Sequence, residues 1–130
     1  MTTREVADRF YELAEQGSFD QILTDLYDEG AKSIEPTNSL WQNVEGIESI
    51  RTKAAQWQTM IHEMHGGYTN KPDVAGNYFV CTMGMDVTLK GQPRMKMDEV
   101  ALYEVKKWED RTGAVLFLTL FCNTCQVSKT

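Results

Sequence analysis

Residues 78–105, YFVCTMGMDVTLKGQPRMKMDEVALYEV, decide the fold of this chain. Apolar residues recur at every second position in two runs, 78–89 and 94–105, and this period is typical of β-strands. One face of the first run carries Phe79, Cys81, Met83, Met85, Val87 and Leu89. The four residues KGQP between the runs are typical of a hairpin turn. The stretch therefore predicts two long antiparallel strands, each with one face toward a core.

Three helices are predicted before this hairpin, at residues 2–16, 19–28 and 46–64. Thr2 and Glu5 fit the S/T-x-x-E capping box that begins a helix, and Gly17 is expected to end the first helix. The third helix is expected to end at Gly66 and Gly67. Its predicted buried stripe consists of Ile47, Ile50, Ala54, Trp57 and Ile61.

Shorter strands are predicted at residues 31–35 and 68–74, and a last strand at residues 114–122. Helices followed by an antiparallel meander are typical of an α+β domain. We therefore expect one domain over residues 1–130, in which three N-terminal helices pack on a curved antiparallel sheet. The sheet is expected to curl around the third helix and to leave a pocket between them.

Composition excludes several classes of partner. The chain has 130 residues and a formal net charge of −6, without a basic stripe, which argues against nucleic acids and anionic membrane surfaces. No window approaches the ~20 apolar residues that a spanning helix needs, and the first ten residues lack the apolar core of a secretion signal, so a cytoplasmic protein is expected. The three cysteines give one CxxC, Cys122 and Cys125, without a second pair. We expect no metal and no cofactor from this pattern.

Three motifs, in this order, resemble the NTF2-like superfamily and in particular its SnoaL-like and ketosteroid-isomerase-like branch. They are RFYELAEQGSFDQILTDLYDEGAKSIEP at 9–36, VEGIESIRTKA at 44–54 and KGQPRMKMDEVALYEV at 90–105. The resemblance implies a cone-shaped α+β barrel with a deep pocket, often dimeric through the outer sheet face. Family members include isomerases, cyclases, dehydratases and proteins that only bind, so the fold leaves the chemistry open.

Two carboxylates are candidate catalytic groups. Glu35 falls where the isomerase branch places its general base, although an exposed Glu35 at a strand end would be inert. Glu99 shares a predicted face with Met97 and Ala101, and a carboxylate among apolar side chains points to function. With the opposite parity, Asp98 would lie inside instead of Glu99, or both carboxylates would be hydrated at a sheet edge.

Steroid isomerisation by the isomerase arrangement is not expected. The resemblance implies two hydrogen-bond donors for an oxyanion, and the matching positions here hold Phe10 and Ala101. Tyr11 is next to the first position but points about 100° away around the helix. Each missing donor is worth several kcal/mol of transition-state stabilisation.

Nine residues are predicted to line a pocket for a flat, apolar small molecule, with ordinary core packing as the alternative for each. They are Phe10, Trp41, Trp57, Met60, Met83, Met85, Met97, Ala101 and Tyr103. His62 and His65 could act as a base or as metal ligands, but histidines at a helix C-terminus are favoured by the helix dipole alone. Asp86 is expected on the outer sheet face.

Two functions follow as hypotheses. The first is a cofactor-independent isomerase, cyclase or dehydratase that uses Glu35 and Glu99 for proton transfer. The second is a non-catalytic ligand-binding or dimerising domain. In either case a homodimer through Tyr78, Val80 and Val100 on the outer face is expected, because these side chains are too apolar to remain fully hydrated.

The sequence after Lys106 departs from the family pattern, in which a strand of the form K-[DN]-G-K-I-x-x-E-x-F-F usually follows ALYEV. Here KKWEDRTGAVLF follows. Because Trp has the single codon TGG and every Glu codon begins with G, reading one base later across Trp108 and Glu109 gives Gly. In this shifted frame, the codon before the Gly can encode Asn, and the two codons after the Gly can encode Lys and Ile. A shifted reading frame and a naturally divergent tail are the two interpretations.

Overall fold

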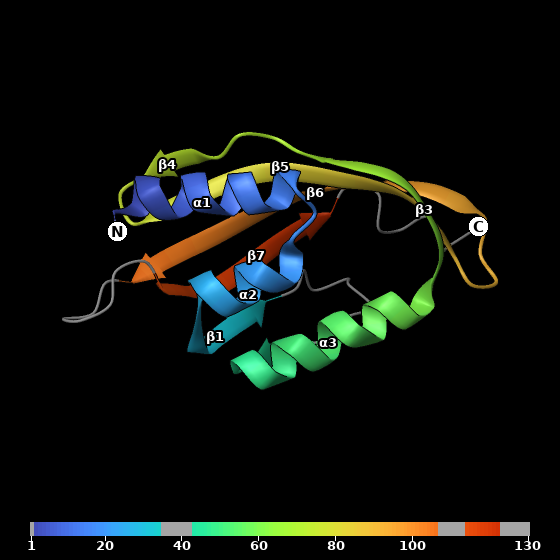
Figure 1. Cartoon of the computed structure of the whole chain (residues 1–130), viewed down its shortest axis with the longest axis horizontal. Helices are drawn as coiled ribbons and strands as arrows, with labels where there is room; N and C mark the ends of the chain where they lie inside the picture. Colours follow the sequence, from blue (N-terminus) through green and yellow to red (C-terminus); the bar gives the residue numbers. More distant parts are fainter. Residues whose placement is uncertain (1, 35–42, 107–113, 123–130) are drawn as a thin grey trace.

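The computed structural model describes residues 2–34, 43–106 and 114–122. Its elements follow in the order α1 (Thr3–Glu15), α2 (Phe19–Leu26), β1 (Tyr27–Ile34), β2 (Val44–Glu45), α3 (Ile47–Met60), β3 (Ile61–Thr69), β4 (Asp73–Ala75), β5 (Tyr78–Leu89), β6 (Arg94–Lys106) and β7 (Ala114–Cys122) (Figure 1). Within these residues no helix is long and apolar enough to cross a membrane.

The strands form one sheet in the order β2-β1-β7-β6-β5-β3, and β4 pairs with β5. Every pair is antiparallel except β1 and β7, which run parallel, so β7 returns to the first strand of the sheet. The expected α+β class, with the helices N-terminal, is confirmed. The predicted strand at 114–122 forms as β7, whereas residues 107–113, where a shifted reading frame would begin, lie outside the described residues.

Helix α1 begins and ends as the sequence predicts. The backbone N–H of Glu5 donates to Thr2 Oγ1 at 3.1 Å, and the N–H of Thr2 donates to Glu5 Oε1 at 2.9 Å. Gly17 follows the helix with a φ of +73°, a left-handed conformation that favours glycine. The buried side of α1 presents Val6, Ala7, Phe10, Leu13 and Ala14 to the sheet.

The predicted end of the third helix is wrong. Helix α3 ends at Met60, and the chain continues as β3, which pairs with β5 along its whole length. The backbone N–H of Lys90 donates to the carbonyl of Met60 at 2.9 Å and so ties the end of α3 to the turn after β5. Backbone pairing with β5 stabilises residues 61–64 as a strand more than their helical preference would stabilise them as a helix.

The predicted buried stripe of this helix is also largely wrong. Ile50 is buried, but Ala54 is exposed, and Trp57 is only half-buried. Helix α3 packs against β1 and β2 and meets β3 at its end, rather than lying flat on the long strands (Figure 1). Arg51 ties α3 to α2, since its guanidinium donates to Asp20 Oδ1 and Thr24 Oγ1, both at 3.0 Å.

The alternation of β5 and β6 divides the sheet into two faces. Residues directly opposite each other on the two strands share a face, and the pairs include Phe79 with Tyr103 and Cys81 with Ala101. These four residues belong to the core beneath α1. We call this the inner face; it continues through Met83, Met85, Val87, Met95, Met97 and Glu99. The intervening residues form the outer face.

Candidate functional site

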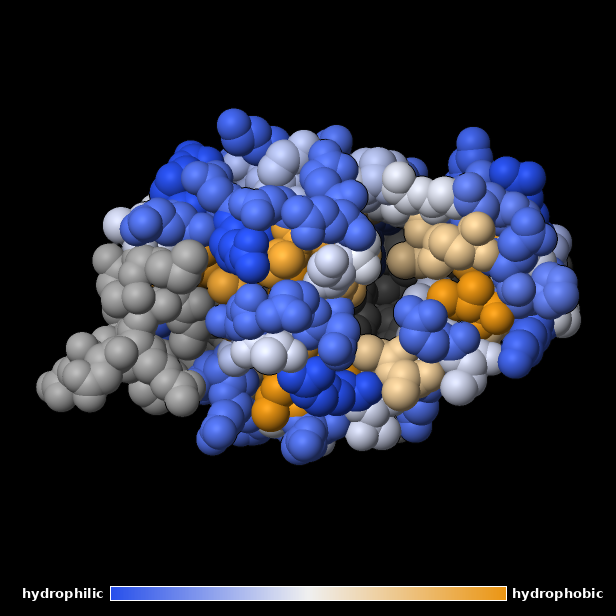
Figure 2. Space-filling model, viewed as in Figure 1, coloured by the Kyte–Doolittle hydropathy of each residue, from blue (hydrophilic) through white to orange (hydrophobic). Residues whose placement is uncertain are grey.

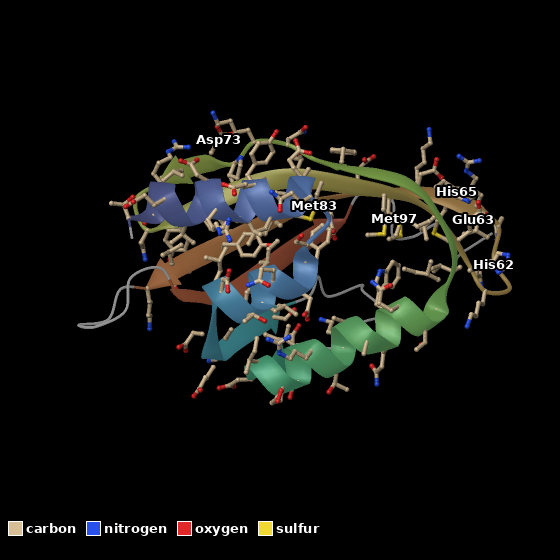
Figure 3. The ribbon with its side chains drawn as sticks, in the orientation of Figure 1. His62, Glu63, His65, Asp73, Met83 and Met97 are labelled. Atoms are coloured by element: carbon tan, nitrogen blue, oxygen red, sulfur yellow. The ribbon has the colours of Figure 1, made fainter. Side chains whose placement is uncertain are left out.

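A hollow lies between the inner face and α3. Figure 2 shows it as a dark recess between the part of the molecule formed by α1 and α2 and the end where α3 meets β3. Met83 and Met97 point from the sheet toward it (Figure 3). Met60 and Met64, at the junction of α3 and β3, are 40% and 47% exposed. The hollow is thus bordered by thioether side chains, which adapt to the shape of an apolar ligand.

Glu99 lies on the inner face. It is half-buried, and it stands directly opposite Met83 on the neighbouring strand. Asp98 points to the outer face, where its Oδ1 accepts a hydrogen bond from the hydroxyl of Tyr68 at 2.6 Å. The parity that places Glu99 inside is therefore confirmed, and the alternative with Asp98 inside is wrong.

Cys81 is the buried thiol beside this carboxylate. Its side chain is free and 4% exposed, and it lies on the strand next to Glu99. Burial, with a smaller contribution from the negative charge of Glu99, raises the pKa of the Cys81 thiol to about 12. Because the thiolate is the reactive form of cysteine, Cys81 is a packing residue at neutral pH and not a nucleophile.

The deep end of the inner face is an aromatic cluster. The ring of Tyr103 stacks on Phe79 with centroids 4.7 Å apart and meets Phe10 at 4.8 Å. Phe10, Ala101 and Tyr103 are 2%, 0% and 4% exposed, so they are packed in the core. Their contact with a ligand stays a prediction.

A second tyrosine reaches this cluster from β1. The Tyr27 side chain is partly buried and packs against the core cluster that contains Tyr103. Burial raises the pKa of both hydroxyls, so both are protonated at neutral pH. The sequence interpretation missed Tyr27 because residue 27 lies within the predicted second helix, whereas α2 ends at Leu26. The strand was predicted only from residue 31, and the alternation of buried Ala31 and Ser33 with exposed Lys32 does not extend back to Tyr27, because Glu29 and Gly30 are both exposed.

The other residues that are predicted to line the pocket lie in different parts of the fold. Met83, Met85 and Met97 are half-buried on the inner face, and Trp57 is half-buried on α3. Met60 lies at the exposed end of α3. Glu35 and Trp41 lie outside the described residues, so their roles stay predictions.

One polar contact that the sequence did not indicate links α3 to β1. The ammonium of Lys53 donates to Ser33 Oγ at 3.2 Å, and Ser33 is only 5% exposed. A hydroxyl this deeply buried needs a hydrogen-bond partner, and Lys53 supplies one while bringing a positive charge to the side of α3 that faces β1.

The two histidines are strand residues, so the prediction that they end a helix is wrong. They lie at the irregular positions of the β3–β5 ladder, between Ile61 and Glu63 and between Met64 and Gly66. Bulges of this kind bend a strand. Figure 3 shows His62, Glu63 and His65 at the bend of β3, away from Met83.

His65 belongs to a polar cluster on the outer face. Its Nε2 is 2.8 Å from Thr88 Oγ1, and its Nδ1 is 3.5 Å from Glu63 Oε2. Asp86 lies on the same face, as expected, and accepts two hydrogen bonds from Arg94 at 2.9 and 2.7 Å. Among the residues that the structure describes, no group of three His, Cys, Asp or Glu side chains could hold a metal ion.

Comparison with known proteins identifies the family of this chain. A family model described as a SnoaL-like domain matches residues 1–113. A solved structure from Mesorhizobium loti, named as a candidate SnoaL-like polyketide cyclase, is 33% identical, with coverage of 93% of this chain and 99% of that chain and a TM-score of 0.84. No curated protein matches the sequence.

More distant structures share the fold. A candidate SnoaL-like polyketide cyclase from Jannaschia sp. CCS1 is 19% identical over 98% of this chain and 89% of that chain, with a TM-score of 0.73. An NTF2-like protein from Burkholderia thailandensis is 11% identical over 99% and 96%, with a TM-score of 0.79. Since the family model spans most of the chain, the protein belongs to the SnoaL-like domain family, and it shares its fold with NTF2-like proteins.

Proposed function

We propose that this protein binds a small, flat, apolar molecule in the hollow and that Glu99 moves a proton on it. The observation that carries the proposal is the position of Glu99 on the inner face, opposite Met83 and next to the aromatic cluster. A half-buried carboxylate on a face that also carries Met83, Met97 and Ala101 is typical of a functional group. The relatives named as polyketide cyclases support a ligand with fused rings and carbonyl groups.

The proposed chemistry needs only a carboxylate. Glu99 takes a proton from a carbon next to a carbonyl group, and the electron pair of that C–H bond moves onto the carbonyl oxygen as an enolate. In an isomerisation the proton returns to another carbon. In a cyclisation the enolate carbon attacks a second carbonyl of the same molecule, and the carboxylic acid protonates the new alkoxide. Glu35, if it lies where the resemblance implies, is the second carboxylate of this scheme.

The alternative function is binding without turnover. The resemblance to the isomerase branch implies that Phe10 and Ala101 stand where its two hydrogen-bond donors would be, and both side chains are packed in the core. In this case the protein is a carrier or a dimerising domain. The homodimer through Tyr78, Val80 and Val100 on the outer face is part of both proposals.

Hydrogen exchange on 2-tetralone, a bicyclic ketone, tests the proton-transfer proposal. In heavy water the wild-type protein should accelerate deuterium incorporation at C1, measured by NMR. Glu99→Gln should lower the rate by roughly 10²–10⁴-fold, the usual contribution of a general base. Asp98→Asn is the matched control, because it removes the neighbouring carboxylate on the outer face, and it should exchange at the wild-type rate.

Binding of 2-naphthol, the aromatic analogue of the 2-tetralone enol, separates the two functions. Binding without exchange in the wild-type protein would favour the carrier. Equal exchange by the wild-type protein and Glu99→Gln would remove Glu99 from the mechanism.

A further inference from the structure

The methionines of the described chain gather around the hollow. They lie on the inner face of the sheet or at the junction of α3 and β3, and they are Met60, Met64, Met83, Met85, Met95 and Met97. Met64 belongs to the inner face because it stands directly opposite Val87, a fully buried residue of that face. Met60 is the last residue of α3, and the hydrogen bond from the N–H of Lys90 to its carbonyl holds it beside the turn after β5. A lining of thioethers is apolar and flexible, but it is also open to oxidation.

Two of these thioethers are more accessible to solvent than the others. Met60 and Met64 are 40% and 47% exposed, whereas the methionines of β5 and β6 are half-buried. An oxidant dissolved in water therefore reaches the sulfur atoms of Met60 and Met64 first. At exposed positions the oxygen of a sulfoxide stays hydrated, so the fold should tolerate the change. A sulfoxide farther inside the inner face would instead bury a polar group among apolar side chains.

The thiol on the inner face does not compete for the oxidant. Cys81 is 4% exposed, and burial raises its pKa to about 12, so almost none of it is the reactive thiolate at neutral pH. Among the side chains whose burial the structure describes, the most accessible oxidisable sulfur atoms are therefore those of Met60 and Met64. Both side chains border the hollow in which the ligand is proposed to bind (Figure 2).

We propose that Met60 and Met64 form a site of reversible oxidation, at which peroxide weakens the binding of apolar ligands in the hollow. The electron pair of the thioether sulfur attacks one oxygen of hydrogen peroxide. The S–O bond forms as the O–O bond breaks, the sulfur is oxidised by two electrons, and the second oxygen leaves as water with the proton of the first. Each sulfoxide then places a polar group where the ligand needs apolar contact, and methionine sulfoxide reductases reverse the step. This inference rests on the proposed function and adds a means of controlling it.

Treatment with dilute hydrogen peroxide, followed by catalase to remove the excess, tests the assignment. Peptide mass spectrometry should show one added oxygen on Met60 and on Met64 before the methionines of β5 and β6 are modified. Fluorescence titration should then show that 2-naphthol binds at least about fivefold more weakly than before peroxide, the lower end of the cost of burying a polar group without a partner. Incubation with the two methionine sulfoxide reductases, one for each sulfoxide epimer, should restore the affinity.

The double variant Met60→Leu/Met64→Leu is the matched control, because it keeps every other oxidisable residue, the cysteines included. Each protein is compared with itself before and after peroxide, and thermal unfolding reports whether it is still folded. Peroxide should leave the affinity of the double variant within about twofold, since leucine has a similar volume and no sulfur. The inference is overturned if the inner methionines are oxidised together with Met60 and Met64, if the oxidised wild type binds as before, or if the double variant loses as much affinity. A wild-type protein that does not bind 2-naphthol even before peroxide would instead refute the proposed function, and the inference with it.

Discussion

Replacement of Gly84 by alanine should destabilise the fold by an amount that the structure predicts. Gly84 lies on the outer face of β5, and the ring of Tyr68 crosses it to reach Asp98. A Cβ atom at residue 84 would collide with Tyr68 Cε1, and it would lie 2.7 Å from Asp98 Oδ1 and 2.8 Å from the carbonyl oxygen of Met97. The first two atoms belong to side chains that can turn away, but the third is backbone of the neighbouring strand.

Two contributions set the magnitude. Moving Tyr68 away breaks its hydrogen bond to a carboxylate, which costs about 1–2 kcal/mol at a partly exposed site. Forcing the backbone of β6 away costs about 1–3 kcal/mol, as other overpacked substitutions do. We therefore expect Gly84→Ala to lower the free energy of unfolding by about 2–5 kcal/mol. Gly66→Ala is the matched control on the adjacent strand, because a Cβ there meets no atom within 4 Å, and its effect should stay within about 0.5 kcal/mol.

Urea denaturation followed by tryptophan fluorescence measures both variants. The protein concentration must be held fixed, since the stability of a dimer depends on it. Equal stabilities for Gly84→Ala and the wild type would refute the reasoning, and so would a Gly66→Ala variant as unstable as Gly84→Ala. Ligand binding in the hollow should change too, because Met83 and Met85, the neighbours of Gly84 in the chain, lie on the inner face.

Four further predictions concern the outer face, the thiol and the tail. Val100→Arg should convert a homodimer into a monomer in sedimentation experiments, and a wild-type protein that is monomeric at micromolar concentration would exclude the dimer. Arg94 holds the pKa of the Asp86 carboxyl below its ordinary 3.8, so the stability that this ion pair adds is present above about pH 4 and is lost as the pH falls further. In urea denaturation, Arg94→Met should be less stable than the wild type at pH 7, and the difference should shrink progressively as the pH falls below about 4. With its pKa raised to about 12 and 4% exposure, Cys81 should resist iodoacetamide at pH 8, read by peptide mass spectrometry, until urea unfolds the protein. The codons of residues 107–117 should spell a G-K-I-like strand one base later if the tail is frame-shifted, and any other reading leaves a divergent tail.

The hairpin could be predicted because its information is local. The period-two pattern at 78–89 and 94–105 corresponds to β5 (Tyr78–Leu89) and β6 (Arg94–Lys106) within one residue. The same alternation placed Glu99 on the inner face, since parity alone decides which of two neighbouring carboxylates points inward.

The start of β3 could not be predicted from its own residues. The irregular positions around His62 and His65 interrupt the alternation, and the pairing that stabilises this strand is made with β5, more than twenty residues later in the chain. Tyr27 was missed for a similar reason. It continues the helical spacing of α2, while the core that it packs against includes residues of β5 and β6, which come much later in the chain.

The structure of the protein in complex with 2-naphthol, solved by crystallography, tests the central claim most directly. The account predicts that the ring system lies on the inner face beside Met83 and Met97. It places C1 about 3–3.5 Å from the Glu99 carboxylate, the approach that proton transfer requires. A ring bound on the outer face, or a hollow without the probe at saturating concentration, would contradict it.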